Sequence, residues 1–224
     1  MISDALLDAW AVLFPVDCAG CGAPDRALCG TCRAALEPEP VPRRLRDGTR
    51  VVSGLDYDGV ARAVMLAFKQ NERTELARYL APALAAAVRA AASESADTES
   101  PWVEGLELVP IPSTRRARRR RGFDPVRLLL TKAGLGSARL FAPAAPHAAQ
   151  KQLDLGGRAA NLHGVFRLRG PVAGRRILLV DDVVTTGATL LEASRVLRDA
   201  GAEVVGAATV ASTPRLFGSS VTTR

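Results

Sequence analysis

The chain has 224 residues, of which 48% are hydrophobic and 4% aromatic, and its formal net charge is +7. This length fits one medium α/β domain with a small added module, and the core must consist mainly of Ala, Val and Leu. No segment reaches the roughly 18 uncharged apolar residues that a membrane-spanning helix needs. The first residues include Asp4 and Asp8 and lack the basic start of a signal peptide, so we expect a cytoplasmic protein.

The periodicity of the apolar residues predicts most of the secondary structure. In chain order, the expected elements are a helix at 4–14, a strand at 50–59, helices at 60–70 and 75–92, a strand at 106–112, a helix at 124–134, a strand at 175–181, a helix at 188–201 and a strand at 202–211. A proline-rich stretch at 37–44 is typical of an extended linker, and a polar loop is expected at 93–101. The last strand, helix and strand predict a parallel crossover, so the fold class is α/β with an open, mainly parallel sheet.

Two adjacent carboxylates, Asp181 and Asp182, stand at the end of the apolar strand 175–181. In open α/β sheets, ligands bind beyond the carboxyl ends of the strands, so this pair is expected to face a ligand. Two acids would repel a bare phosphate, but they can accept hydrogen bonds from the hydroxyl groups of a sugar phosphate. The pair therefore predicts a ligand that combines phosphate with ribose hydroxyls.

The segment after the acids has the composition of a phosphate-binding loop. The next helix is expected to start near Gly187 or Ala188, and its first backbone N–H groups have no partner within the helix. Thr185, Thr186 and Thr189 add hydroxyl donors, and Gly187 permits a positive φ or a close backbone approach. Together these groups predict a cradle for the phosphate of the ligand.

Two other interpretations of the acid pair compete with this one. Receiver domains of response regulators also end a strand in paired acids, which bind Mg²⁺. In those domains a phospho-acceptor Asp and a Lys follow on later strands, whereas no lysine follows Asp182 here. The remaining alternative is an acidic turn that only caps the next helix.

Six arginines crowd into the seven residues Arg115–Arg121 and supply most of the net positive charge. Such a local charge favours a local anionic partner, and the alternative is a solvated, mobile loop. One small ligand needs fewer arginines, so the excess predicts contacts with nucleic-acid phosphates. The arginines concerned are Arg116, Arg118, Arg119, Arg120 and Arg121. Phe123 is the one aromatic residue nearby, so a base-stacking platform is not expected.

All four cysteines form two Cys-x2-Cys pairs, Cys18 with Cys21 and Cys29 with Cys32. Four thiolates in this arrangement are typical of a tetrahedral Zn²⁺ site, in which four protein ligands leave the ion a structural role. Disulfides compete with this interpretation, but a reducing cytoplasm and the paired spacing disfavour them. An iron–sulfur cluster is a further alternative.

Residues 178–190, "LLVDDVVTTGATL", resemble the ribose-phosphate loop of type I phosphoribosyltransferases, which bind phosphoribosyl pyrophosphate (PRPP). Residues 109–124 and 150–166, together with the cysteine pairs, resemble the ComF family, which includes ComFC and GntX-type proteins. The resemblance extends from about Cys18 to Val210. It implies the sheet of a type I phosphoribosyltransferase with a small N-terminal zinc module held by the four cysteines.

The resemblance also implies the site residues. Those that would bind PRPP are Asp181, Asp182, Val183, Val184, Thr185, Thr186, Gly187, Ala188 and Thr189 in the ribose-phosphate loop and Ser113, Thr114 and Arg115 in the pyrophosphate loop. Residues 150–161 would form the loop that closes over the substrate, or else a plain surface loop, and Arg158 would act with Asp181 and Asp182 in catalysis. The family usually has Asn-Gln where this chain has Asp124-Pro125, and Asp124 is predicted to cap the next helix instead.

The resemblance implies three domains: a helix, zinc module and linker at 1–42, a phosphoribosyltransferase-like domain at 43–215, and a flexible tail at 216–224. It implies a protein that binds PRPP with Mg²⁺ and acts in DNA uptake, natural competence or DNA handling. The partners would be single-stranded DNA and other competence or DNA-handling proteins. Two alternatives stay open, namely an active phosphoribosyltransferase with an unidentified acceptor and a regulator that senses PRPP or nucleotides without chemistry.

Overall fold

The computed structural model describes residues 16–93, 105–142 and 166–213. The helix predicted at 4–14, most of the polar loop at 93–101, the closing loop with Arg158 and the tail at 216–224 lie outside the described residues. Within the described ranges, no helix is both long enough and apolar enough to cross a membrane.

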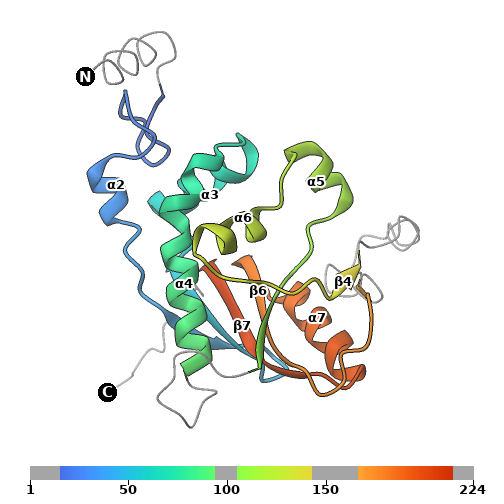
Figure 1. The fold of residues 1–224 in the computed structure, drawn as a ribbon. Coiled ribbons are helices and arrows are strands. Elements are labelled where there is room, and N and C mark those ends of the chain that lie inside the picture. Colours follow the sequence, from blue (N-terminus) through green and yellow to red (C-terminus); the bar gives the residue numbers. More distant parts are fainter. Residues whose placement is uncertain (1–15, 94–104, 143–165, 214–224) are drawn as a thin grey trace, which may run out of the picture.

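The strands form an open, mainly parallel sheet, which confirms the predicted fold class (Figure 1). Its order is β1 (Val41–Arg44), β2 (Arg50–Asp56), β7 (Glu203–Ser212), β6 (Arg176–Val184) and β3 (Leu106–Pro110). β1 is antiparallel to β2, and the other neighbours are parallel. A separate antiparallel pair consists of β4 (Phe141–Ala142) and β5 (Arg167–Leu168).

Helices cover both faces of this sheet (Figure 1). The described helices are α2 (Gly30–Ala34), α3 (Gly59–Gln70), the short 3-10 helix η1 (Thr74–Leu76), α4 (Ala77–Ser93), α5 (Arg115–Arg121), α6 (Pro125–Lys132) and α7 (Ala188–Asp199). Buried residues of α3, α4 and α6 form one apolar cluster with the sheet, and those of α7 form a second cluster on the opposite face. α4 lies so close to β2 that a Cβ atom at Gly54 would collide with the backbone of Ala83.

The arginine segment, for which the sequence left a solvated loop as an alternative, is the helix α5, so the loop interpretation is wrong. Thr114 caps its start, with its hydroxyl oxygen accepting a hydrogen bond from the N–H of Ala117 at 3.2 Å. Gly122 ends it with a positive φ of 71°. Arginine is also a good helix former, so local propensity and both caps outweigh the repulsion between like charges.

The strand predicted at 175–181 continues to Val184, which is a second correction. β7 pairs with β6 over this extension, from Asp181 opposite Thr209 to Val184 opposite Ser212. On the other side, the pairing of β6 with β3 stops at Val180. The acids therefore lie where β6 has lost one neighbour and kept the other, which opens the sheet beside them.

The cysteine segment packs against the main core through α3 and η1. Cys18 and Cys32 are buried in the same apolar cluster as the residues of α3 and α4. The guanidinium group of Arg73 donates hydrogen bonds to the carbonyl oxygens of Asp17 at 2.7 Å and Ala27 at 3.3 Å. The proline-rich segment 37–44, predicted as a linker, ends in β1 and so joins the sheet.

Candidate functional site

A pocket of about 470 Å³ opens at the carboxyl ends of β3 and β6. The chain leaves β3 towards α5 and α6 and leaves β6 towards α7 on the opposite face, so the two connections diverge and leave a crevice. Of the residues predicted to bind PRPP, the pocket brings together Ser113, Thr114, Asp181, Asp182 and Thr189. The two segments predicted as binding loops, more than 60 positions apart in the sequence, therefore face one cavity.

The loop between β6 and α7 has the backbone expected of a phosphate cradle. Gly187 has a φ of 77°, which favours glycine, and a Cβ atom there would lie 2.5 Å from the end of the Leu45 side chain, which would have to move. The first turn of α7 begins at Ala188, whose N–H donates to the hydroxyl of Thr186 at 3.4 Å. Thr185 and Thr186 are exposed and can donate their hydroxyls to a ligand.

Arg43, a residue that the sequence did not indicate, forms a hydrogen bond with the backbone of this loop. The guanidinium group of Arg43 in β1 donates to the carbonyl oxygen of Thr185 at 3.0 Å. Because Arg43 belongs to a segment predicted as a linker, no sequence signal connected it with the loop. The β1–β2 hairpin thus supports the cradle through Arg43 and Leu45.

Both acids are only partly exposed, and they have different interaction partners. The carboxylate of Asp181 accepts a hydrogen bond from the N–H of Asp182 at 2.8 Å, and Asp182 forms an ion pair of 2.8 Å with Lys69. Burial, and after it the charge of Asp182, raises the pKa of Asp181 to about 8. The pocket therefore holds one carboxyl group that resists ionisation beside one that is neutralised by a lysine.

Lys69 is the second site residue that sequence reasoning missed. It lies in the last turn of α3, and both Lys69 and Gln70 line the pocket. A basic residue at a helix end usually interacts with the helix dipole, so its position alone gave no reason to expect a partner in β6.

The predicted arginines divide between two places. Arg120 and Arg121 line the pocket with the acids, whereas Arg118 lines a separate, neighbouring hollow. Arg119 is exposed and lines neither. The side chains of Arg115 and Arg116 lie outside the described part of the chain.

Other predicted site residues have mainly structural contacts. Val184 is only 2% exposed and belongs to the apolar cluster on the α7 face, while Val183 packs against the opposite cluster. Asp124 caps α6 as predicted, accepting a hydrogen bond from the N–H of Arg127 at 3.3 Å, and Pro125 is the first residue of that helix. Asp124 and Pro125 therefore both suit the start of a helix.

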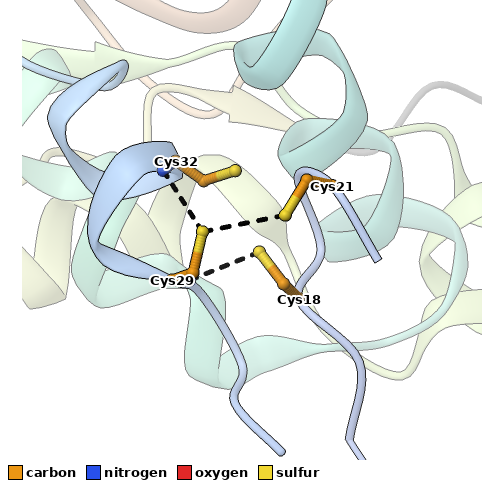
Figure 2. Close-up of side chains that lie close together, drawn as sticks. All are labelled: Cys18, Cys21, Cys29 and Cys32. Carbon is orange, nitrogen blue, oxygen red and sulfur yellow. Dashed lines mark hydrogen bonds between the residues drawn. The ribbon is translucent and has the colours of Figure 1, made fainter. Parts of the chain in front are cut away.

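The four cysteines form a compact cluster whose sulfur atoms all lie within 4.8 Å of one another (Figure 2). Cys18 and Cys21 come from a loop, and Cys29 and Cys32 from the start of α2. The sulfur atoms of Cys21 and Cys29 are 3.7 Å apart, and all four cysteines are free thiols. Such a cluster can hold a metal ion, as the sequence predicted.

The electrostatics of the cluster also suit a cation. Burial disfavours the thiolate of Cys18, but backbone N–H groups of Cys29, Cys21 and Gly20 outweigh it and lower the pKa of Cys18 to about 6. Burial raises the pKa of Cys32, with its neighbouring cysteines adding to the effect. A bound cation would reverse this penalty, since metal ions favour the thiolate form.

Comparison with known proteins agrees with the arrangement of these two sites. Residues 140–216 match the phosphoribosyl transferase domain family. Over 201 residues the chain is 32% identical to the DNA utilization protein YhgH of Salmonella typhimurium, in an alignment that covers 84% of this chain and 80% of the relative. The chain belongs to the ComF family. As a ComF protein, it combines a phosphoribosyltransferase domain with an N-terminal cluster of four cysteines.

Two further similarities concern orotate phosphoribosyltransferases. A stretch of 55 residues is 51% identical to the enzyme of Streptomyces avermitilis, covering 24% of this ComF chain and 30% of the enzyme. The crystal structure of the enzyme from Mycobacterium tuberculosis H37Rv aligns with 20% identity and a TM-score of 0.33, covering 80% of this chain and 79% of that one.

Proposed function

We propose that this ComF protein binds PRPP with Mg²⁺ in the pocket between β3 and β6. The observation that supports this most strongly is that Ser113 and Thr114 face Asp181 and Asp182 across one cavity. The 5′-phosphate would lie at the start of α7, the ribose hydroxyls would donate to the acids, and the diphosphate would lie on the Ser113 side.

The charges around the pocket fit the parts of this ligand. Arg120 and Arg121 line the wall next to Ser113, where guanidinium groups can pair with a diphosphate. Mg²⁺ would reduce the remaining negative charge of the diphosphate. On binding, the ion pair between Lys69 and Asp182 would break. Asp182 would then accept a hydrogen bond from a ribose hydroxyl, and Lys69 would pair with the diphosphate.

A direct test is calorimetric titration of the metal-loaded protein with PRPP, with and without Mg²⁺. The double variant Asp181→Asn/Asp182→Asn keeps the size of both side chains and replaces each carboxyl group with an amide that cannot ionise. We expect saturable, Mg²⁺-dependent binding in the wild type and at least about tenfold weaker binding in the variant. Equal affinity in both proteins would rule out the acids as ribose ligands.

We propose that the metal of the cysteine cluster is Zn²⁺ and that its role is structural. Four sulfur ligands at the usual Zn–S distance of about 2.3 Å lie about 3.8 Å apart in a tetrahedron. The 3.7 Å between Cys21 and Cys29 fits this geometry, and four protein ligands leave no open position for substrate. Metal analysis of the purified protein, with Cys29→Ser as the comparison, tests the identity and the stoichiometry of the ion.

We further propose that the protein binds single-stranded DNA through α5 and acts in the cytoplasm in DNA uptake or handling, with other proteins of those processes as partners. The similarity to a DNA utilization protein supports this, as do the exposed side chains of Arg118 and Arg119.

Salt dependence of DNA binding tests this proposal. In the Arg118→Ala/Arg119→Ala variant, the negative slope of the logarithm of affinity against the logarithm of salt concentration should decrease in magnitude by about 1.4. Exposed arginines elsewhere, changed in Arg62→Ala/Arg89→Ala, provide a control with the same loss of charge. Equal DNA affinities in the two variants would contradict this proposal.

A further inference from the structure

A second hollow, of about 120 Å³, lies beside the PRPP pocket and shares Pro112 and Ser113 with it. Four arginines line it: Arg118 of α5, Arg127 of α6, Arg139 just before β4 and Arg169 just after β5. These segments are separated in the sequence, and the fold gathers their guanidinium groups around one small space. The predicted PRPP site uses none of these four residues.

The hollow has a large excess of positive charge. Asp124 is the only acid among its lining residues, and its carboxylate caps α6. Within the described ranges, no carboxylate forms an ion pair with any of the four arginines. Arginine stays protonated in proteins, so the cluster repels itself at every physiological pH.

The charges around the hollow act on Arg127. Burial lowers the pKa of Arg127, and the charges of Arg139, Arg118 and Arg169 lower it further, opposed by Asp124. An anion bound between the four guanidinium groups would reduce their mutual repulsion and could form charge-assisted hydrogen bonds with each of them. One of them is also fixed in place, because Arg169 donates to the carbonyl oxygen of Phe141 at 3.0 Å.

We propose that this hollow is a second oxyanion site and that it binds a phosphate group. Planar guanidinium forks match the oxygen atoms of phosphate and pair with them at two points. A volume of about 120 Å³ leaves room for a phosphate group. The group is either free phosphate or one phosphate of a nucleic-acid strand.

The two cavities are adjacent but separable. Pro112 and Ser113 line both, so the loop after β3 forms the wall between them. Arg139 and Arg169 line only the second hollow, whereas Thr185 and Thr186 belong to the cradle at the start of α7. Substitutions at these two pairs can therefore distinguish the sites.

Calorimetric titration with inorganic phosphate tests the proposal in three forms of the metal-loaded protein. The wild type should bind at two sites, the Arg139→Gln/Arg169→Gln variant should lose the second, and the Thr185→Val/Thr186→Val variant should lose the first. We expect affinity at the second site to fall about tenfold or more in the arginine variant. Thermal unfolding followed by circular dichroism establishes that each variant is folded, and Arg62→Gln/Arg89→Gln controls for the loss of charge.

Unchanged phosphate binding in Arg139→Gln/Arg169→Gln would overturn the second site, as would a wild type with binding only in the cradle. A threonine variant that keeps both sites would instead count against the PRPP proposal and leave the second site standing. Fluorescence anisotropy with labelled oligo-dT then identifies the source of the phosphate. Weaker DNA binding in the arginine variant assigns the hollow to a strand, and equal binding assigns it to free phosphate.

Discussion

At the scale of single residues, the pocket depends on how Asp181, Asp182 and Lys69 share charge. Lys69 pairs with Asp182, while burial holds Asp181 in its protonated form over a wide pH range. A ligand that donates hydroxyl groups to both acids favours their ionised forms, so binding and proton release should be linked.

This arrangement predicts a pH-dependent stability that depends on Asp181. The unfolded chain releases the proton of Asp181 near its ordinary pKa of 3.8, whereas the folded protein holds it up to a pKa of about 8. The folded state therefore binds more protons between these values, and its stability falls as the pH rises through that window. Asp181→Asn should abolish this loss of stability. The free energy of unfolding of the variant minus that of the wild type should therefore increase from pH 4 to pH 8.

Urea unfolding of both proteins at several pH values measures the difference. Titrating groups that do not interact with Asp181 contribute alike to the two proteins and cancel. A difference that stays constant between pH 5 and pH 9 would mean that the pKa of Asp181 is not raised.

At the scale of elements, the loop between β6 and α7 depends on the β1–β2 hairpin behind it. Gly187→Ala would introduce a side chain at a φ of 77° and within 2.5 Å of Leu45. We expect a loss of about 1–3 kcal/mol in unfolding free energy, and weaker PRPP binding because the cradle must shift.

The second variant, Gly187→Ala/Leu45→Ala, separates the two causes. Removing the Leu45 side chain relieves the collision and leaves the backbone strain, so the cost of Gly187→Ala should be smaller in the Leu45→Ala background. A full cost in that background would show that the contact with Leu45 contributes nothing.

The elements also show what the sequence could and could not predict. Apolar periodicity located α3, α6 and α7 because each has a single buried face that a short window reveals. Continuous apolar runs located the parallel strands, which are buried on both faces. The motif around Asp181 identified the loop, since its chemistry lies in consecutive residues. Lys69 and Arg43 were missed because they contact that loop from positions more than 100 residues earlier, which no local pattern records. The charge of the arginine segment masked its helix, although the caps Thr114 and Gly122 were present in the sequence.

At the scale of the whole molecule, the cysteine cluster is part of the core and not an appendage. Cys18 and Cys32 lie in the same apolar cluster as Phe68 and Leu80, and Arg73 joins the cysteine loop to η1. Loss of the metal should therefore weaken the phosphoribosyltransferase domain as well as the cysteine segment.

Chelation of the metal tests this coupling. We expect the melting temperature of the whole protein to fall by about 5 °C or more, in a single transition. Re-addition of Zn²⁺ should restore it, and Cys32→Ser should reproduce the loss. If the melting transition of the main domain stays in place after chelation, the cysteine segment folds independently.

The central claim is that the pocket between β3 and β6 binds PRPP, and the most direct measurement is its calorimetric titration with Mg²⁺ present. We predict saturable binding in the wild type that disappears without Mg²⁺ and falls about tenfold or more in Asp181→Asn/Asp182→Asn. No heat of binding in the folded, metal-loaded wild type, or full affinity in the double variant, would contradict the claim.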